Sequence, residues 1–121
     1  MVKALFDTNI LIDYLSGIAA AKKELGRYEY RAISTITWME VLVGASIEEE
    51  QSIRGWLGSF DVIAVDSAIA NRAVEIRKAR RIRLPDAIIW ATAQVYSMLL
   101  VSRNTKDFPA EEPGVRVPYK V

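Results

Sequence analysis

The chain has 121 residues, 51% of them hydrophobic, which suits one domain with a substantial core and is too short for two. It contains neither cysteine nor histidine, so disulfides, zinc–thiolate sites, thiol nucleophiles and serine–histidine triads are excluded. The formal net charge of +1 neither favours nor excludes a nucleic-acid partner, because a basic patch can lie within a balanced total.

Neither a leader nor a membrane span is expected. Asp7 interrupts the first apolar run too early for a signal peptide. The apolar stretch over 87–93 falls far short of the ~20 residues that cross a bilayer. We therefore expect a single domain over residues 1–121 that is soluble and cytoplasmic, with no membrane contact.

The first half of the chain predicts two strands, each followed by helices. Residues 2–6 form a short, nearly all-apolar run, as in a strand that is buried on both faces of a parallel sheet. Apolar residues at helical spacing then continue to Gly17, and a second short helix is expected over 19–25. The next elements are a strand over 31–36, a helix over 37–45 and a more polar helix over 48–57.

The second half continues the alternation. A strand is expected over 61–65, a long helix after Asp66, a helix over 86–98 with Pro85 in its first turn, and strands over 99–102 and 115–117. This order predicts an α/β domain with a mainly parallel sheet of four or five strands and right-handed crossovers. Ligands of such sheets bind at the carboxyl ends of the strands.

Acidic and amide residues fall near those predicted strand ends. They are Asp7 after the first strand, Glu40 past the second, Asp66 after the third, Asn104 and Asp107 past the fourth, and Asp86 at a helix start. If the sheet is parallel, several of these side chains converge in one crevice.

Each acid also has a structural explanation. Asp7 or Thr8 can cap the first helix, and the spacing from Thr37 to Glu40 fits a capping box. Asp86 can stabilise a helix dipole, by roughly 0.3–1 kcal/mol. For Asp66 we favour the capping interpretation.

A joint role for Asp7, Glu40 and Asp86 goes beyond capping. Carboxylates within roughly 4–6 Å of one another repel, and either protonation or a hard divalent cation relieves the repulsion. Ligands that are only oxygen favour Mg²⁺ or Mn²⁺. Such an ion lowers the pKa of a bound water until it can attack phosphorus, so no histidine is needed. The sequence therefore favours metal-dependent cleavage of phosphodiester bonds.

Four segments resemble PIN-domain proteins, and more narrowly the VapC toxins of type II toxin–antitoxin pairs. They are LFDTNILIDYL at 5–15, ISTITWMEVLVGA at 33–45, LPDAIIWATA at 84–93 and LLVSRNTKDF at 99–108. Their order and the chain length make the resemblance specific. It implies a PIN-like three-layer α/β/α sandwich and an Mg²⁺- or Mn²⁺-dependent ribonuclease.

The resemblance also implies site residues. By position, Asp7 and Asp86 match the family's principal metal-binding aspartates, and Glu40 matches its glutamate. Asn104 stands where many members carry an acid, and Asp107 follows it. An amide can accept a hydrogen bond from a metal water but adds no charge. Asp107 either completes the catalytic and metal-binding set or only closes a turn, and both interpretations stay open.

Three polar residues are expected to orient these acids. A hydroxyl or amide hydrogen bond fixes which carboxylate oxygen faces an ion. We expect Thr8 and Asn9 to orient Asp7 in this way, and Ser102 to act near Asp107.

The densest charge run lies just before Asp86. Five of the seven residues over 77–83 are basic. Such a run is either a solvated helix face or a site for RNA phosphates. The candidate contacts with RNA, or with acidic residues of an antitoxin, are Arg80, Arg81, Arg83, Arg103 and Lys106. For Trp38, Trp56 and Trp90 we expect core or interface packing rather than base stacking.

The resemblance implies partners as well. These are an RNA substrate, with transfer RNA as a family-level expectation, a second copy of the chain in a homodimer, and a small VapB-like antitoxin whose tail enters the active-site groove. Two alternatives remain. One is a degenerate PIN fold that binds RNA or protein without cleavage, which Asn104 keeps open. The other is a receiver-type signalling domain, for which only Asp66 stands in a suitable place.

Overall fold

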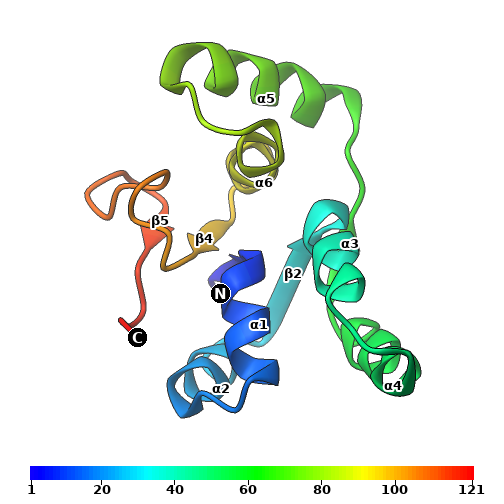
Figure 1. Cartoon of the computed structure of the whole chain (residues 1–121). Coiled ribbons are helices and arrows are strands. Elements are labelled where there is room, and N and C mark those ends of the chain that lie inside the picture. The colour runs from blue at the N-terminus through cyan, green and yellow to red at the C-terminus, as the bar shows by residue number, and fades with distance from the viewer.

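The computed structural model describes residues 1–121 as a five-stranded, all-parallel sheet with helices on both faces (Figure 1). The strands are β1 (Lys3–Phe6), β2 (Tyr30–Ser34), β3 (Asp61–Ile63), β4 (Leu99–Val101) and β5 (Val115–Arg116). Their order is β3-β2-β1-β4-β5, so the chain runs from β1 to one edge and then returns to the other side of β1. A receiver-type order of 2-1-3-4-5 is therefore excluded.

Six helices cover this sheet. They are α1 (Thr8–Leu15), α2 (Ala19–Leu25), α3 (Thr35–Val43), α4 (Ile47–Leu57), α5 (Ser67–Arg80) and α6 (Leu84–Val95). Figure 1 shows α6, with α5 beyond it, on one side of the sheet, and α1 and α2 on the other. The predicted three-layer α/β/α sandwich is thus confirmed. None of the helices has the length and apolar character that a bilayer crossing requires.

The side chains of each strand point alternately to the two faces of the sheet, and this divides the core into two layers. Leu5 of β1 packs with the residues of α5 and α6, whereas Ala4 and Phe6 pack with those of α1, α3 and α4. Ala32 and Ile33 of β2 divide in the same way. Because side chains of a strand point alternately to opposite faces, the all-apolar run at the N-terminus is what a central strand between two helical layers requires.

The boundary between β2 and α3 differs from the prediction. The strand ends at Ser34, whose hydroxyl caps α3 by accepting a 3.1 Å hydrogen bond from the Ile36 amide. Thr37 therefore lies inside the helix, and the capping-box interpretation of Thr37 and Glu40 is wrong. The carboxylate of Glu40 is free to serve another purpose.

Two other acids do cap or begin helices as expected. Asp66 precedes α5 and accepts a 2.8 Å hydrogen bond from the Ile69 amide. Asp86 lies in the first turn of α6, directly after Pro85. The helix α6 ends at Val95 rather than Met98, because Ser97 adopts a left-handed conformation with a φ of 55°.

Candidate active site

Asp7 follows β1 and is almost fully buried, with 4% of its surface exposed. Its Oδ1 accepts a 2.8 Å hydrogen bond from the Thr8 amide, and Asp7 is thereby the cap of α1. Its Oδ2 accepts bonds from Asn9 Nδ2 at 3.1 Å and Ser102 Oγ at 2.7 Å. Burial raises the pKa of the carboxyl group, while the three hydrogen bonds oppose that rise. Asp7 thus has a fixed orientation as well as a capping role.

Ser102 forms its hydrogen bond with Asp7. We expected it to act near Asp107 instead. Phe6 of β1 lies opposite Val101 of β4, so the next residue of each strand comes side by side. The Asp7 amide also donates a 2.9 Å hydrogen bond to the Val101 carbonyl. The parallel register of β1 and β4 therefore places Ser102 against Asp7.

Glu40 reaches the same place from α3. Its Oε1 accepts a 2.6 Å hydrogen bond from the Thr8 hydroxyl, which also lies 3.0 Å from the Thr37 hydroxyl. Thr8 was expected to orient Asp7 through its side chain. Instead its backbone amide contacts Asp7, and its hydroxyl orients Glu40.

Asp86 is repelled by the other acids. Burial, followed by the negative charges of Asp7 and Asp107, raises its pKa from 3.8 to about 6. Glu40 adds to this effect, and Arg83 opposes it. The repulsion arises because Asp86 shares one cavity with Asp7, Glu40 and Asp107.

Asn104 and Asp107 form a pair. The Asn104 amide donates a 3.0 Å hydrogen bond to Asp107 Oδ2, and Asn104 Oδ1 accepts a 3.3 Å bond from the Asp107 amide. The Asn104 backbone amide in turn donates to Ser102 Oγ at 3.0 Å. The loop after β4 is thus tied to the residues around Asp7.

All of these acids line one cavity of about 580 Å³ at the carboxyl ends of the strands. Its lining consists of Asp7, Thr8, Asn9, Ile12, Glu40, Arg83, Asp86, Arg103, Asn104, Lys106 and Asp107. No three of the carboxylates converge closely enough to hold a single ion together. The acids therefore surround an open space.

The sequence matches the family model of the PIN domain over residues 4–110. The chain belongs to the PIN-domain family.

Within this family, the PIN domain is similar to proteins of the VapC type, as the four sequence segments predicted. It is 32% identical over 125 residues to Ribonuclease VapC10 of Mycobacterium tuberculosis, an alignment that covers 97% of this chain and 93% of the relative. It is 50% identical to a chain in a toxin–antitoxin complex from Klebsiella pneumoniae, with a TM-score of 0.93 and coverage of 98% and 100% of the two chains. FitAcB from Neisseria gonorrhoeae, 22% identical with a TM-score of 0.80 and coverage of 98% and 99%, shares the fold.

The basic residues predicted to contact RNA or an antitoxin separate into two groups. Arg83, Arg103 and Lys106 line the acidic cavity. Arg80 does not, because its guanidinium forms a 2.6 Å ion pair with Glu112 and lies over the Trp90 ring. Arg81 ends α5 in a left-handed conformation and is also outside the cavity lining. Most of the basic run is therefore a solvated helix end.

The three tryptophans pack against other side chains, as predicted. Trp90 is buried edge-on against Phe108, and Trp56 stacks on Tyr14. Trp38 lies beneath the Arg54 guanidinium. None of them lines the acidic cavity.

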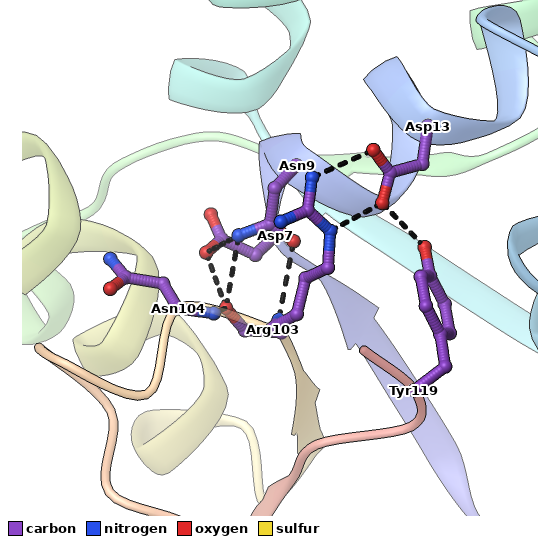
Figure 2. Close-up of polar contacts among 7 residues, drawn as sticks. Asp7, Asn9, Asp13, Arg103, Asn104 and Tyr119 are labelled. Carbon is purple, nitrogen blue, oxygen red and sulfur yellow. Dashed lines mark hydrogen bonds and ion pairs between the residues drawn. The ribbon is translucent and has the colours of Figure 1, made fainter. Parts of the chain in front are cut away.

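Asp13 and Tyr119 were not predicted as site residues. Asp13 accepts hydrogen bonds from the Arg103 guanidinium at the cavity wall, and Tyr119 donates a hydrogen bond to Asp13 (Figure 2). Asp13 lies four residues after Asn9 on α1, and residues at this spacing share a helix face. An acid on the same face as a site residue was the available signal. The partner of Asp13 could not be read from the sequence, because Arg103 is 90 residues away.

Proposed function

We propose that this PIN domain is the toxin ribonuclease of a toxin–antitoxin pair, and that it hydrolyses RNA with Mg²⁺ or Mn²⁺. The observation that carries the proposal is one acidic cavity lined by Asp7, Glu40, Asp86 and Asp107, which come from four separate parts of the chain. The relative named Ribonuclease VapC10 supports the same conclusion.

The donor set fits a hard divalent cation. Carboxylate and amide oxygens are the protein ligands that the cavity offers. Burial and the neighbouring negative charges raise the pKa of Asp86, and a cation would relieve the repulsion among the acids. Mg²⁺ keeps several waters and is commonly bound through one or two carboxylates together with substrate phosphates. Acids that surround an open space suit that mode better than an all-protein cage.

Asp7 and Asp86 are the proposed principal ligands, with Glu40 and Asp107 at the sides of the cavity. When bound, the ion would supply Lewis acidity toward a water molecule and the scissile phosphate. Thr8 holds Glu40, and Asn104 holds Asp107 through both ends of its amide. We therefore assign Asp107 as the fourth acid, and Asn104 as the residue that orients it and a secondary candidate ligand.

Arg83 and Lys106 are the proposed phosphate contacts. Both line the cavity beside the acids, and neither forms an ion pair within the chain. Free basic groups next to a metal site can bind the RNA backbone on either side of the scissile bond. A family-level expectation of transfer RNA as the substrate belongs to this proposal.

The antitoxin is proposed to bind an apolar groove that continues from the cavity. The groove has a volume of about 200 Å³ and includes Ile12, Leu15, Val41 and Ile53 in its lining. Ile12 lines the acidic cavity as well, so a segment lying in the groove can continue into the site. The similar chain from Klebsiella pneumoniae belongs to a toxin–antitoxin complex, which supports a VapB-like partner.

Incubation of the purified chain with structured RNA tests the nuclease proposal. We expect cleavage with Mn²⁺ and none with EDTA or in Asp7→Asn. Asp66→Asn is the matched control, because both aspartates cap a helix after a parallel strand and asparagine caps as well as aspartate does. Activity of Asp7→Asn equal to that of Asp66→Asn would show that Asp7 has only a capping role.

The same incubation tests the alternative of a degenerate PIN fold that binds RNA without cleaving it. A wild-type chain that binds RNA but does not cleave it with Mg²⁺ or Mn²⁺ would be a binding module. Persistent cleavage in EDTA would instead contradict metal dependence.

Co-purification with the product of the adjacent open reading frame tests the partner. Leu15→Asp in the groove should abolish the complex, whereas Val74→Asp, on the exposed face of α5, should not. Light scattering tests the proposed homodimer, for which we expect twice the 13.6 kDa mass of the chain. A mass of 13.6 kDa at micromolar concentration would contradict the dimer.

A further inference from the structure

Arg103 spans one turn of α1 with two separate contacts. Its backbone amide donates a 3.3 Å hydrogen bond to Asn9 Oδ1. Its guanidinium donates through both Nε and Nη2 to the Asp13 carboxylate, at 2.8 Å for Nη2 and Asp13 Oδ1. Figure 2 shows both contacts, with Asn9 and Asp13 on the same side of the helix. The loop after β4 is therefore attached to α1 at two points.

The C-terminal segment adds a third point. The Tyr119 hydroxyl donates a 2.8 Å hydrogen bond to Asp13 Oδ2, so Asp13 receives three donors and only 4% of it is exposed. The hydrogen bonds from Arg103 hold the pKa of Asp13 below its usual value, which keeps the carboxylate ionised and the pair intact. A planar guanidinium bound through two nitrogens has one orientation, which a lysine cannot reproduce.

These contacts lead directly to Asp7. The side-chain amide of Asn9 accepts the hydrogen bond from Arg103 at Oδ1. Through Nδ2 the same amide donates hydrogen bonds to both Asp7 Oδ2 and Ser102 Oγ. With Oδ1 fixed by Arg103, the amide cannot rotate without losing all three hydrogen bonds. Ser102 and Asn104, on either side of Arg103 in the chain, belong to the same network.

Resting on the proposed nuclease function, we propose that Arg103, held by Asp13 and Tyr119, is a positioning residue that acts through Asn9 to fix Asp7 in the active site. Arg103 lines the cavity, but its two guanidinium hydrogen bonds go to Asp13. Its contribution is therefore to the orientation of the acid and not to RNA binding.

The chain contains a matched control for this arrangement. Glu24 is also 4% exposed, accepts from Arg116 through Nε at 2.7 Å and Nη2 at 3.0 Å, and accepts from the Tyr28 hydroxyl at 2.9 Å. The side chains of Arg103 and Arg116 are 31% and 34% exposed. Glu24, Tyr28 and Arg116 are absent from the cavity lining. Breaking either cluster should thus cost similar stability, while only one lies beside Asp7.

The experiment compares Arg103→Lys and Asp13→Asn with Arg116→Lys and Glu24→Gln in the full chain. With RNA and Mn²⁺, we expect kcat to fall on the order of 10-fold in the first pair, with KM for RNA little changed. The control pair should keep wild-type kcat at the same folded fraction. If Arg103 instead contacts RNA, Asp13→Asn would release it, lower KM and leave kcat intact, which would overturn the proposal.

A second readout does not need activity. Two-dimensional NMR should show that the Asn9 side-chain amide shifts and the backbone amide at position 103 exchanges faster in Arg103→Lys and Asp13→Asn. Neither signal should change in Arg116→Lys. An unchanged Asn9 signal in Arg103→Lys would overturn the positioning role even if the wild-type chain proved to cleave no RNA, an outcome that would refute only the proposed function.

Discussion

Ser102 donates a 2.7 Å hydrogen bond to Asp7, although 95 residues separate them in the chain. Both residues immediately follow neighbouring parallel strands, β4 and β1. The bond opposes the effect of burial on the pKa of Asp7 and therefore favours the ionised carboxylate that a cation needs.

Ser102→Ala should destabilise the fold and weaken the site. Removing a buried hydrogen bond to a carboxylate should lower the free energy of unfolding by about 1–3 kcal/mol. The pKa of Asp7 should also rise, so cleavage at a given pH should need more Mn²⁺. Urea denaturation and Mn²⁺ titration measure the two effects. Ser59→Ala is the control, because its hydroxyl bonds the Trp56 carbonyl in an exposed turn. Equal stability of the two variants would contradict the prediction.

Thr8→Val should reduce cleavage more than Thr8→Ser. Valine keeps the shape of threonine but lacks the hydroxyl that donates to Glu40, whereas serine retains it. Loss of a bond that orients a site carboxylate should cost roughly 10-fold in activity. Steady-state cleavage assays at saturating Mn²⁺ compare the two variants. Equal activities would mean that the Thr8 hydroxyl does not orient Glu40 productively.

Asp86→Asn should stabilise the metal-free protein at neutral pH while removing its activity. The pKa of Asp86 is about 6 in the folded chain, against 3.8 ordinarily, so the folded state binds the proton more tightly. The stability due to this proton is present below pH 3.8 and is lost as the pH rises through about 6. Because the side chain is partly exposed, we expect a gain on the order of 1–2 kcal/mol at pH 7.

Thermal unfolding from pH 3.5 to 7.5, without metal, checks this difference. The wild type and Asp86→Asn should converge at the acidic end. Asp66→Asn should behave in the opposite sense, because a hydrogen bond from Tyr96 lowers the pKa of Asp66 in the folded chain. Adding Mn²⁺ above pH 6 should raise the melting temperatures of the wild type and Asp66→Asn, but not that of Asp86→Asn. If the difference in melting temperature between the wild type and Asp86→Asn does not change with pH, the pKa of Asp86 is not raised in the folded chain.

Arg83→Ala and Lys106→Ala should each weaken RNA binding in a salt-dependent way. Loss of one phosphate contact should reduce the slope of log K against log salt by about 0.7 for a single-stranded RNA. Fluorescence anisotropy over a salt series measures the slope. Arg80→Ala removes the contacts of Arg80 with Glu112 and Trp90, so it should lower the free energy of unfolding. It should leave the slope of log K against log salt unchanged. A slope change in Arg80→Ala but not in Arg83→Ala would place the RNA on α5 instead.

Much of the fold could be predicted because its signals are local. The apolar run before Asp7, the Asp66 cap and Pro85 at a helix start each depend on a few adjacent residues. The boundary between β2 and α3 was misjudged because apolar and β-branched residues from Ile33 to Thr37 suit either element. The cap at Ser34 decided where the helix starts.

The sequence by itself determined the order of strands and helices, the family resemblance, and the acids that a parallel sheet brings to one edge. Only the tertiary structure decided the partners: Ser102 with Asp7, Thr8 with Glu40, and Arg103 with Asp13. The physical reason is that burial and periodicity are properties of short segments, whereas a hydrogen-bond partner depends on which strands are neighbours and in which register they pair.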